Sequence, residues 1–134
     1  MQSLPTFEAL PEAFIHTDVA PTNAIERQNG DLTFIDWDDA GVGTRVLDVG
    51  FPLIQQFVSE ERQFLERNAR AFYGAYFSRM KLTDEEMRHI FPAALLIALM
   101  YIKYGDTLKR WRRIEWAIEN RGALDLVVNS AAKA

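Results

Sequence analysis

The stretch His16-Thr17-Asp18-Val19-Ala20-Pro21-Thr22-Asn23, together with Ile35-Asp36-Trp37, decides how this 134-residue chain is interpreted. Asn and Asp oxygens are hard ligands that suit Mg²⁺, which keeps several waters and binds one or two carboxylates plus substrate phosphates. If Asn23 and Asp36 hold such an ion, Asp18 remains available to accept a proton from an incoming hydroxyl. These groups are the minimum set for metal-assisted phosphoryl transfer.

The segments beside these residues predict a small β structure. The segment Ala-Phe-Ile-His at 13–16 predicts a strand, so that Asp18 falls in the loop after it. Residues 24–28 and 31–37 predict a hairpin, because Asn-Gly at 29–30 is the strongest short-range signal for a type I′ turn.

A two-residue loop at 29–30 predicts the hairpin's register. Paired positions then sum to 59, so Ile25 faces Phe34 and Asn23 faces Asp36. Leu32 shares the face of Ile25 and Phe34, and this apolar face is expected to pack on a core. Directly opposed Cβ atoms lie about 4.5–5.5 Å apart, which is close enough for Asn23 and Asp36 to share one ion.

The rest of the chain has helical periodicity. Helices are predicted over about 45–58, with 42–44 as the start, and over 60–81, 84–104 and 107–131, with a break at Gly122. Thr83 followed by Glu86 is a capping box, and Gly105 predicts the end of that helix. The predicted fold class is mainly α with a small β-hairpin (α+β), in a single domain.

Composition excludes several classes of protein. Without cysteine and with two histidines, the chain can hold no disulfide framework, thiolate zinc site or His-rich metal site. A net charge of −4 argues against a nucleic-acid partner. The longest apolar run, residues 91–102, is too short to span a membrane, and the N-terminus does not read as a signal peptide. We therefore expect a cytoplasmic protein with no membrane partner.

The pattern HxDxxxxN followed by IDW resembles the signature of the aminoglycoside phosphotransferase and choline kinase-like superfamily. These are small-molecule kinases with a protein-kinase-like fold. The segment AGVGTRVLDVG at 40–50 is similar to the family's A-x-x-G-x-x-x-x-D-L, with Asp48 as its acidic residue. The family usually has Gly at the position of Thr17. The resemblance is sharp over residues 13–50, and the later helices fit it only by length and pattern.

The resemblance implies a role for each matching residue. Asp18 would be the catalytic base, and Asn23 and Asp36 would hold Mg²⁺ between the nucleotide phosphates. His16 would pack under the catalytic loop, and Asp48 would brace that loop by accepting backbone N–H bonds. ATP or GTP would be the co-substrate, and the acceptor a small-molecule hydroxyl compound of the amino sugar or amino alcohol class.

Fifteen residues precede His16, where the family has a whole nucleotide-binding lobe. Neither GxGxxG nor GxxxxGK is present. We therefore expect residues 1–134 to correspond to the C-terminal lobe of a kinase-like fold, with the catalytic loop and metal-binding hairpin at 13–37 and a helical part at 44–133. The expected function is that of a catalytic and acceptor-binding lobe, inactive as an isolated chain.

Other readings of the chain remain open. It could be a non-enzymatic helical remnant or subunit that binds a protein partner. The basic run at 109–113 predicts a solvated face with Trp111 packed inward and Arg112 paired with Glu115; an RNA-contacting domain would rest on this run alone. Asp38 and Asp39 predict a solvated turn, with attraction of a cationic acceptor as the functional alternative.

The N-terminal segment bears on assembly. Its apolar residues Leu4, Phe7, Leu10 and Phe14 would lack partners without a first lobe. This predicts a homodimer, or exchange of the N-terminal segment between two copies; the alternative is a monomer in which residues 1–12 fold back over the gap.

Overall fold

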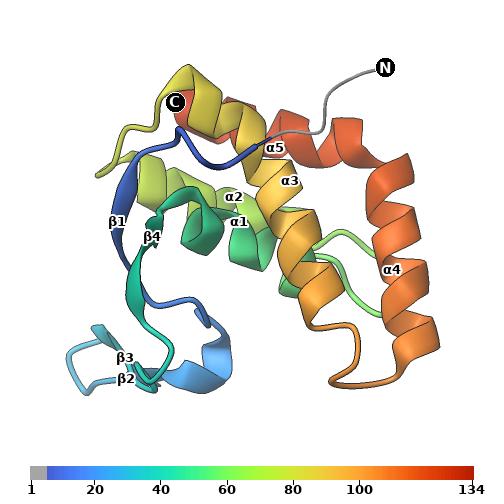
Figure 1. Cartoon of the computed structure of the whole chain (residues 1–134), viewed down its shortest axis with the longest axis horizontal. Helices are drawn as coiled ribbons and strands as arrows, with labels where there is room; N and C mark the ends of the chain where they lie inside the picture. Colours follow the sequence, from blue (N-terminus) through green and yellow to red (C-terminus); the bar gives the residue numbers. More distant parts are fainter. Residues whose placement is uncertain (1–5) are drawn as a thin grey trace.

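Helices form the body of the molecule, and two small sheets stand beside it (Figure 1). The computed structural model describes residues 6–134. Its helices are α1 (Val46–Gln55), α2 (Glu66–Phe77), α3 (Asp84–Met100), α4 (Thr107–Glu119) and α5 (Arg121–Lys133). Its strands are β1 (Glu12–Ile15), β2 (Ala24–Glu26), β3 (Leu32–Phe34) and β4 (Gly41–Thr44), with a 3₁₀ turn η1 at Pro21–Asn23. The predicted α+β class is confirmed.

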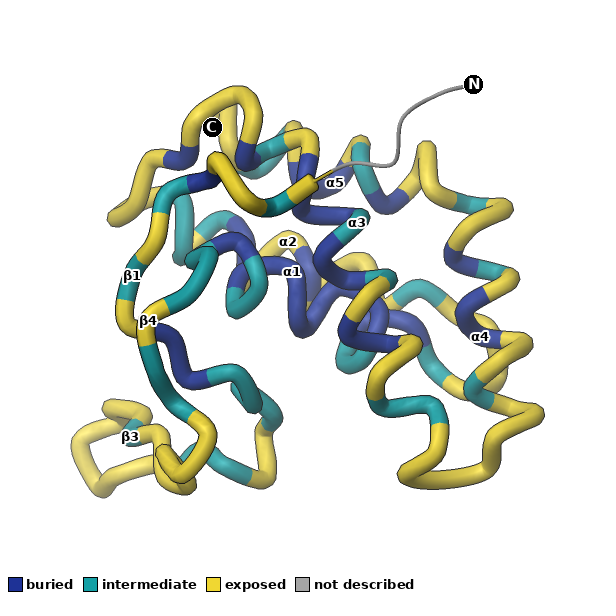
Figure 2. The backbone as a smooth tube through the Cα atoms, viewed as in Figure 1, coloured by how far each residue is buried: buried dark blue, intermediate teal, exposed yellow. Residues whose placement is uncertain are grey.

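The core lies where α1 packs against α3, and buried residues follow both helices in Figure 2. Small residues allow the close approach, since Ala93 and Ala94 of α3 are fully buried. A Cβ added at Gly50 of α1 would stand 2.7 Å from both the Ala93 Cβ and the Ile90 carbonyl oxygen. Glycine is therefore required for this helix contact.

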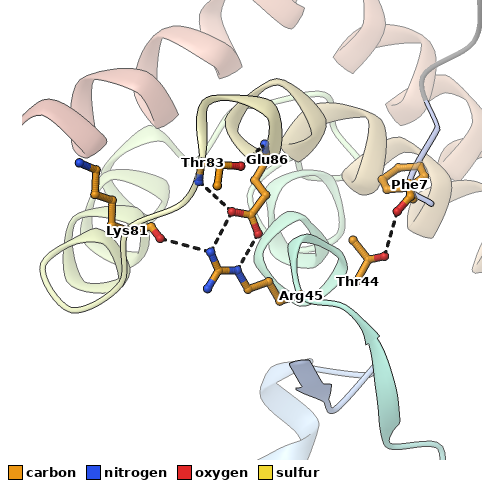
Figure 3. Close-up of polar contacts among 6 residues, drawn as sticks. All are labelled: Phe7, Thr44, Arg45, Lys81, Thr83 and Glu86. Carbon is orange, nitrogen blue, oxygen red and sulfur yellow. Dashed lines mark hydrogen bonds and ion pairs between the residues drawn. The ribbon is translucent and has the colours of Figure 1, made fainter. Parts of the chain in front are cut away.

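The capping box is confirmed at the start of α3 (Figure 3). Thr83 Oγ1 accepts from the Glu86 amide at 3.1 Å, and Glu86 Oε2 accepts from the Thr83 amide at 2.8 Å. These bonds satisfy two of the amide donors that a helix N-terminus leaves free.

Helix boundaries differ from the predictions where turns intervene. The helix expected from 60 begins only at Glu66, because Val58 and Phe64 form a bridge around a tight turn in which Arg62 has a φ of 62°. The helix expected to reach 104 ends at Met100, and the break expected at Gly122 falls at Asn120.

Residues 42–44 form strand β4 and not the start of a helix. They pair antiparallel with β1, in the register Glu12↔Thr44 and Ile15↔Gly41. The pairing joins segments about thirty residues apart, which no local pattern signals. It brings the loop after β1 next to the first turn of α1.

The predicted hairpin register is wrong by one residue. Ala24 pairs with Phe34 and Ile25 with Thr33, so paired positions sum to 58. The loop has three residues, because the Arg27 amide bonds to the Asp31 carbonyl at 2.8 Å, and only Gly30 has a positive φ, 85°. A left-handed glycine that closes a three-residue loop replaces the type I′ turn.

The shifted register changes which side chains share a face of the hairpin. Ile25 lies on the face opposite Leu32 and Phe34, and Asn23 pairs with Ile35, whose amide bonds to the Asn23 carbonyl at 2.8 Å. The expected direct pairing of Asn23 with Asp36 is therefore wrong. Leu32 is 65 % exposed, so the expected packing of this face on a core is also wrong.

The N-terminal segment lies against the helices. Leu10 is buried and Phe7 packs on the core, where its ring lies edge-on to His89 at 5.4 Å. Phe14 remains 67 % exposed. Leu4 falls outside the described residues. Over 6–134, no helix is long and apolar enough to cross a membrane.

Candidate active site

One carboxylate braces the loop that carries Asp18. Asp48, in the first turn of α1, accepts the His16 amide on Oδ2 at 2.7 Å and the Thr17 amide on Oδ1 at 2.9 Å. Each oxygen therefore receives one backbone donor, and both donors come from the turn that follows β1. Charge-assisted bonds of this kind are about twice as strong as neutral ones. The conformation of the loop is thus tied directly to the helical core.

His16 connects the loop to the segment after β3. Its side chain is buried, and Nε2 lies 2.7 Å from the Ile35 carbonyl. Nδ1 accepts from the Asp18 amide at 3.2 Å, so the ring proton is assigned to Nε2, which donates to Ile35. The ring also lies edge-on to the Trp37 indole at 4.5 Å. His16 thereby holds both halves of the sequence motif in one place.

Asn23 orients the Asp18 carboxylate from the end of η1. Its Nδ2 donates to the Asp18 carbonyl at 3.0 Å and to Asp18 Oδ2 at 2.9 Å. This arrangement commits the amide nitrogen to Asp18 and leaves the amide oxygen as an acceptor. Asp18 keeps its second carboxylate oxygen, Oδ1, for another partner.

Two positions in the site have left-handed backbone. Thr17 has a φ of 75° and Asp36 a φ of 61°. For a β-branched residue this region is a true outlier, with a cost of about 1–2 kcal/mol. The turn after His16 is therefore one that glycine adopts freely, which gives a physical reason for glycine at this position in the sequences that the chain resembles. At Asp36, the left-handed backbone ends the strand alternation, so its side chain does not follow the pleat of β3.

Asn23 and Asp36 carry oxygen atoms of the type that hard cations bind. The Asp36 carboxylate is exposed and the Asn23 amide oxygen is free of hydrogen bonds within residues 6–134. No cluster of three or more His, Cys, Asp or Glu side chains in that range could hold a metal by itself. Two donors suit Mg²⁺ only if water and substrate phosphates complete its shell.

A cavity of about 450 Å³ opens beside Asp18, between the η1 loop and the α3–α4 turn. It extends from Asp18 past the C-terminal end of α1 to the first turns of α4. Its polar lining comprises Asp18, Thr22, Gln55, Gln56, Tyr101, Tyr104, Arg110 and Arg113.

The interpretation of the basic run at 109–113 as a solvated face with an inward Trp111 is wrong. Trp111 is 45 % exposed and its Nε1 donates to Glu115 at 3.0 Å, whereas Arg113 is only 6 % exposed. Glu115 thus bonds to Trp111 in place of the predicted Arg112. The sequence spacing predicts only that Arg110, Arg113 and Ala117 share one face of α4, and the structure shows that this face lies inside.

Asp38 and Asp39 are both exposed in the turn before β4, which agrees with the predicted solvated turn.

A braced Asp loop, an Asn that holds the same Asp, and a second Asp after a short hairpin together have the organisation of a kinase-like phosphotransferase. Comparison with protein families matches residues 1–83 to the phosphotransferase enzyme family. The chain belongs to this family, and the resemblance drawn from the motif is confirmed. The family has a kinase-like fold. Neither the curated proteins nor the solved structures include a significant match to the chain.

Proposed function

We propose that this chain is the catalytic and acceptor-binding lobe of a Mg²⁺-dependent small-molecule kinase that moves a phosphoryl group from ATP or GTP to a hydroxyl. The observation that carries this proposal is the pair of hydrogen bonds that Asn23 Nδ2 donates to the Asp18 carbonyl and carboxylate, in a loop that Asp48 braces. Asp18 also lines the cavity of about 450 Å³ that opens beside the loop. We place the reaction in the cytoplasm, which suits a chain without cysteine.

Different residues handle the proton of the acceptor and the phosphates of the nucleotide. Asp18 accepts the proton of the acceptor hydroxyl as that oxygen attacks the terminal phosphorus. Asn23 and Asp36 would hold Mg²⁺, which supplies neutralisation of phosphate charge when bound. Asn23 also fixes the Asp18 carboxylate in one orientation, and His16 and Asp48 keep the loop rigid. Such preorganisation contributes to the rate of transfer, because the reacting groups are already positioned before the reaction begins.

We expect no detectable transfer from this chain by itself. General-base catalysis contributes only about 10²–10⁴-fold. The larger share comes from positioning and from stabilising charge on the transferring group, and among residues 6–134 we propose only Asn23 and Asp36, through Mg²⁺, to act on the nucleotide. Phosphoryl transfer is measured as ADP or GDP release, with amino sugars, amino alcohols and hydroxy acids as acceptors. If the wild-type chain shows turnover and Asp18→Asn abolishes it, the chain is a complete enzyme, and the expectation that the isolated lobe is inactive is wrong.

The metal role has a test that does not need turnover. Mn²⁺ replaces Mg²⁺ as a paramagnetic probe, and its binding is followed by electron paramagnetic resonance with and without ATP. We expect ATP to strengthen Mn²⁺ binding and Asp36→Asn to remove that gain. Asp38→Asn, an exposed carboxylate two residues away, is the matched control and should change nothing. Equal binding in both variants would overturn the metal assignment.

A further inference from the structure

A buried guanidinium that forms no ion pair within residues 6–134 lines the cavity beside Asp18. Arg113 is 6 % exposed, and one of its terminal nitrogens donates to Gln55 Oε1 at 2.6 Å. Its Nε has no hydrogen-bond partner in residues 6–134, and Arg113 takes part in none of the ion pairs of that range. A buried charge of this kind is expensive unless something pairs with it.

Arg110, one turn earlier on α4, repeats the pattern. One terminal nitrogen donates to the Tyr101 carbonyl at 2.9 Å, and its buried Nε is likewise unpartnered in the described part of the chain. A Cβ on Gly105 would overlap the Arg110 Nε, so the backbone of the α3–α4 turn packs directly on the guanidinium. Both arginines are therefore held in place by polar and backbone contacts that do not neutralise them.

The charges that line the cavity are two guanidinium groups and one carboxylate. Burial lowers the pKa of Arg113, the positive charge of Arg110 lowers it further, and Glu60 opposes both effects. Burial raises the pKa of the Tyr101 phenol, as does the negative charge of Asp18, so this hydroxyl remains a donor. An anion between the two arginines would offset both the burial of the Arg113 charge and its repulsion by Arg110.

We propose that the cavity beside Asp18 binds an acceptor that carries an anionic group, a carboxylate or a phosphate, on Arg110 and Arg113, with its hydroxyl toward Asp18. This inference rests on the proposed function, because it names the acceptor class of that site. It departs from the amino sugar or amino alcohol class, whose ammonium group would face two guanidinium groups. The cavity of about 450 Å³ has room for a small metabolite.

Four probes that share a 1,2-diol and differ in the third substituent test the charge preference. They are glycerate, glycerol 3-phosphate, glycerol and 3-aminopropane-1,2-diol. The readout is the ¹H–¹⁵N resonance of each arginine Nε, which reports binding without any turnover. We expect glycerate or glycerol 3-phosphate to shift the Arg110 and Arg113 signals and to bind about tenfold or more tightly than glycerol, as a charge-assisted bond allows. Comparison of these two probes decides between carboxylate and phosphate.

Variants assign the effect to residues. Arg113→Gln should weaken binding of the anionic probe about tenfold, whereas Arg112→Gln, its exposed neighbour, is the matched control and should not. Arg110→Gln tests the same site from a less buried position if Arg113→Gln does not fold. Equal binding of charged and neutral probes, or tighter binding of the aminodiol, would overturn the proposal. Arginine shifts that only ATP produces would also overturn it, since the arginines would then bind nucleotide.

The two proposals fail in different ways. Asp18→Asn removes the proposed base but keeps the arginines, so binding of the anionic probe should persist in this variant. If probe binding persists and ATP does not strengthen Mn²⁺ binding, the kinase function is wrong while the anion site stands. If a complete enzyme phosphorylates only neutral or amino alcohols, the kinase function stands and the anionic acceptor is wrong.

Discussion

Arg45 and Glu86 form a bidentate ion pair that joins the residue before α1 to the first turn of α3 (Figure 3). Arg45 Nε lies 2.6 Å from Oε1 and its terminal nitrogen 2.8 Å from Oε2, while Glu86 is fully buried. The same carboxylate closes the capping box with the Thr83 amide. Because Arg45 lies three residues before Asp48, this pair fixes the chain just ahead of the carboxylate that braces the catalytic loop.

Replacement of Glu86 by Gln should destabilise the fold by about 3 kcal/mol, because it leaves Arg45 without its buried partner. Its neighbour Glu85 also bonds to an arginine, Arg88, but both side chains are more than half exposed. Glu85→Gln is therefore the matched control, and its effect should stay within about 0.5 kcal/mol. Urea unfolding of both variants measures the difference. Equal losses would contradict the role given to the Arg45–Glu86 pair.

Acid should weaken the same interaction. Hydrogen bonds from Arg45 lower the pKa of Glu86, and burial only partly opposes them. A carboxyl with a lowered folded pKa stabilises the fold fully above its unfolded pKa of about 4.3, and this contribution is lost as pH falls through the folded value. The unfolding free energy of the wild type should therefore decline below about pH 4 more steeply than that of Glu86→Gln. Parallel pH profiles would contradict this.

Asp48→Asn should loosen the catalytic loop. An amide offers one oxygen where the carboxylate accepts two N–H groups, and its NH₂ would face a backbone donor. We expect a loss of about 1–3 kcal/mol and faster hydrogen exchange at the His16 and Thr17 amides. Asp38→Asn is the exposed control, and unchanged exchange at both amides in Asp48→Asn would show that the brace does not hold the loop.

Thr17→Gly should raise stability slightly. Threonine pays about 1–2 kcal/mol for its left-handed backbone, and glycine loses about 0.5–1 kcal/mol through its freer unfolded chain. The expected net gain is about 0.5 kcal/mol, measured by thermal or urea unfolding. Thr17→Ala keeps a Cβ and should show no gain. If glycine and alanine behave alike, backbone strain is not the cause.

Two helical glycines should respond in opposite directions to alanine. At Gly50 the new methyl would overlap Ala93 and force α1 and α3 apart, with a loss of about 1–3 kcal/mol. At Gly74 in α2 a Cβ meets nothing within 4 Å, so alanine should add about 0.5–1 kcal/mol through its helix propensity. Calorimetric unfolding compares them, and losses of similar size would refute the close α1–α3 contact.

The exposed apolar surface on the β1–β4 side predicts a homodimer. Phe14 and Val42 are 67 % and 75 % exposed, and the Phe14 ring stacks on Trp37 at 6.1 Å. Contiguous apolar surface of this kind is commonly covered by a partner. Sedimentation should detect a concentration-dependent species above 15.4 kDa that Val42→Lys removes. Leu126→Lys, at an equally apolar exposed site on α5, is the control, and a 15.4 kDa species at all concentrations refutes the dimer.

Local sequence determined the features whose causes lie within a few residues. The capping box needs only Thr83 and Glu86, three positions apart, and it forms as predicted. Apolar periodicity places the helices, and the spacing of Asp18, Asn23 and Asp36 identifies the family. These signals act through short-range hydrogen bonds and helix geometry, so sequence alone is enough to find them.

Tertiary structure decided the features that depend on distant partners or on a choice between close alternatives. The hairpin register changed by one residue because a single left-handed glycine closes a three-residue loop, a geometry that Asn-Gly does not distinguish from the type I′ turn. The β1–β4 pair joins segments about thirty residues apart. Arg113 lies inside and Trp111 outside because Gln55, fifty-eight residues away, offers the guanidinium a buried acceptor that no local pattern reveals.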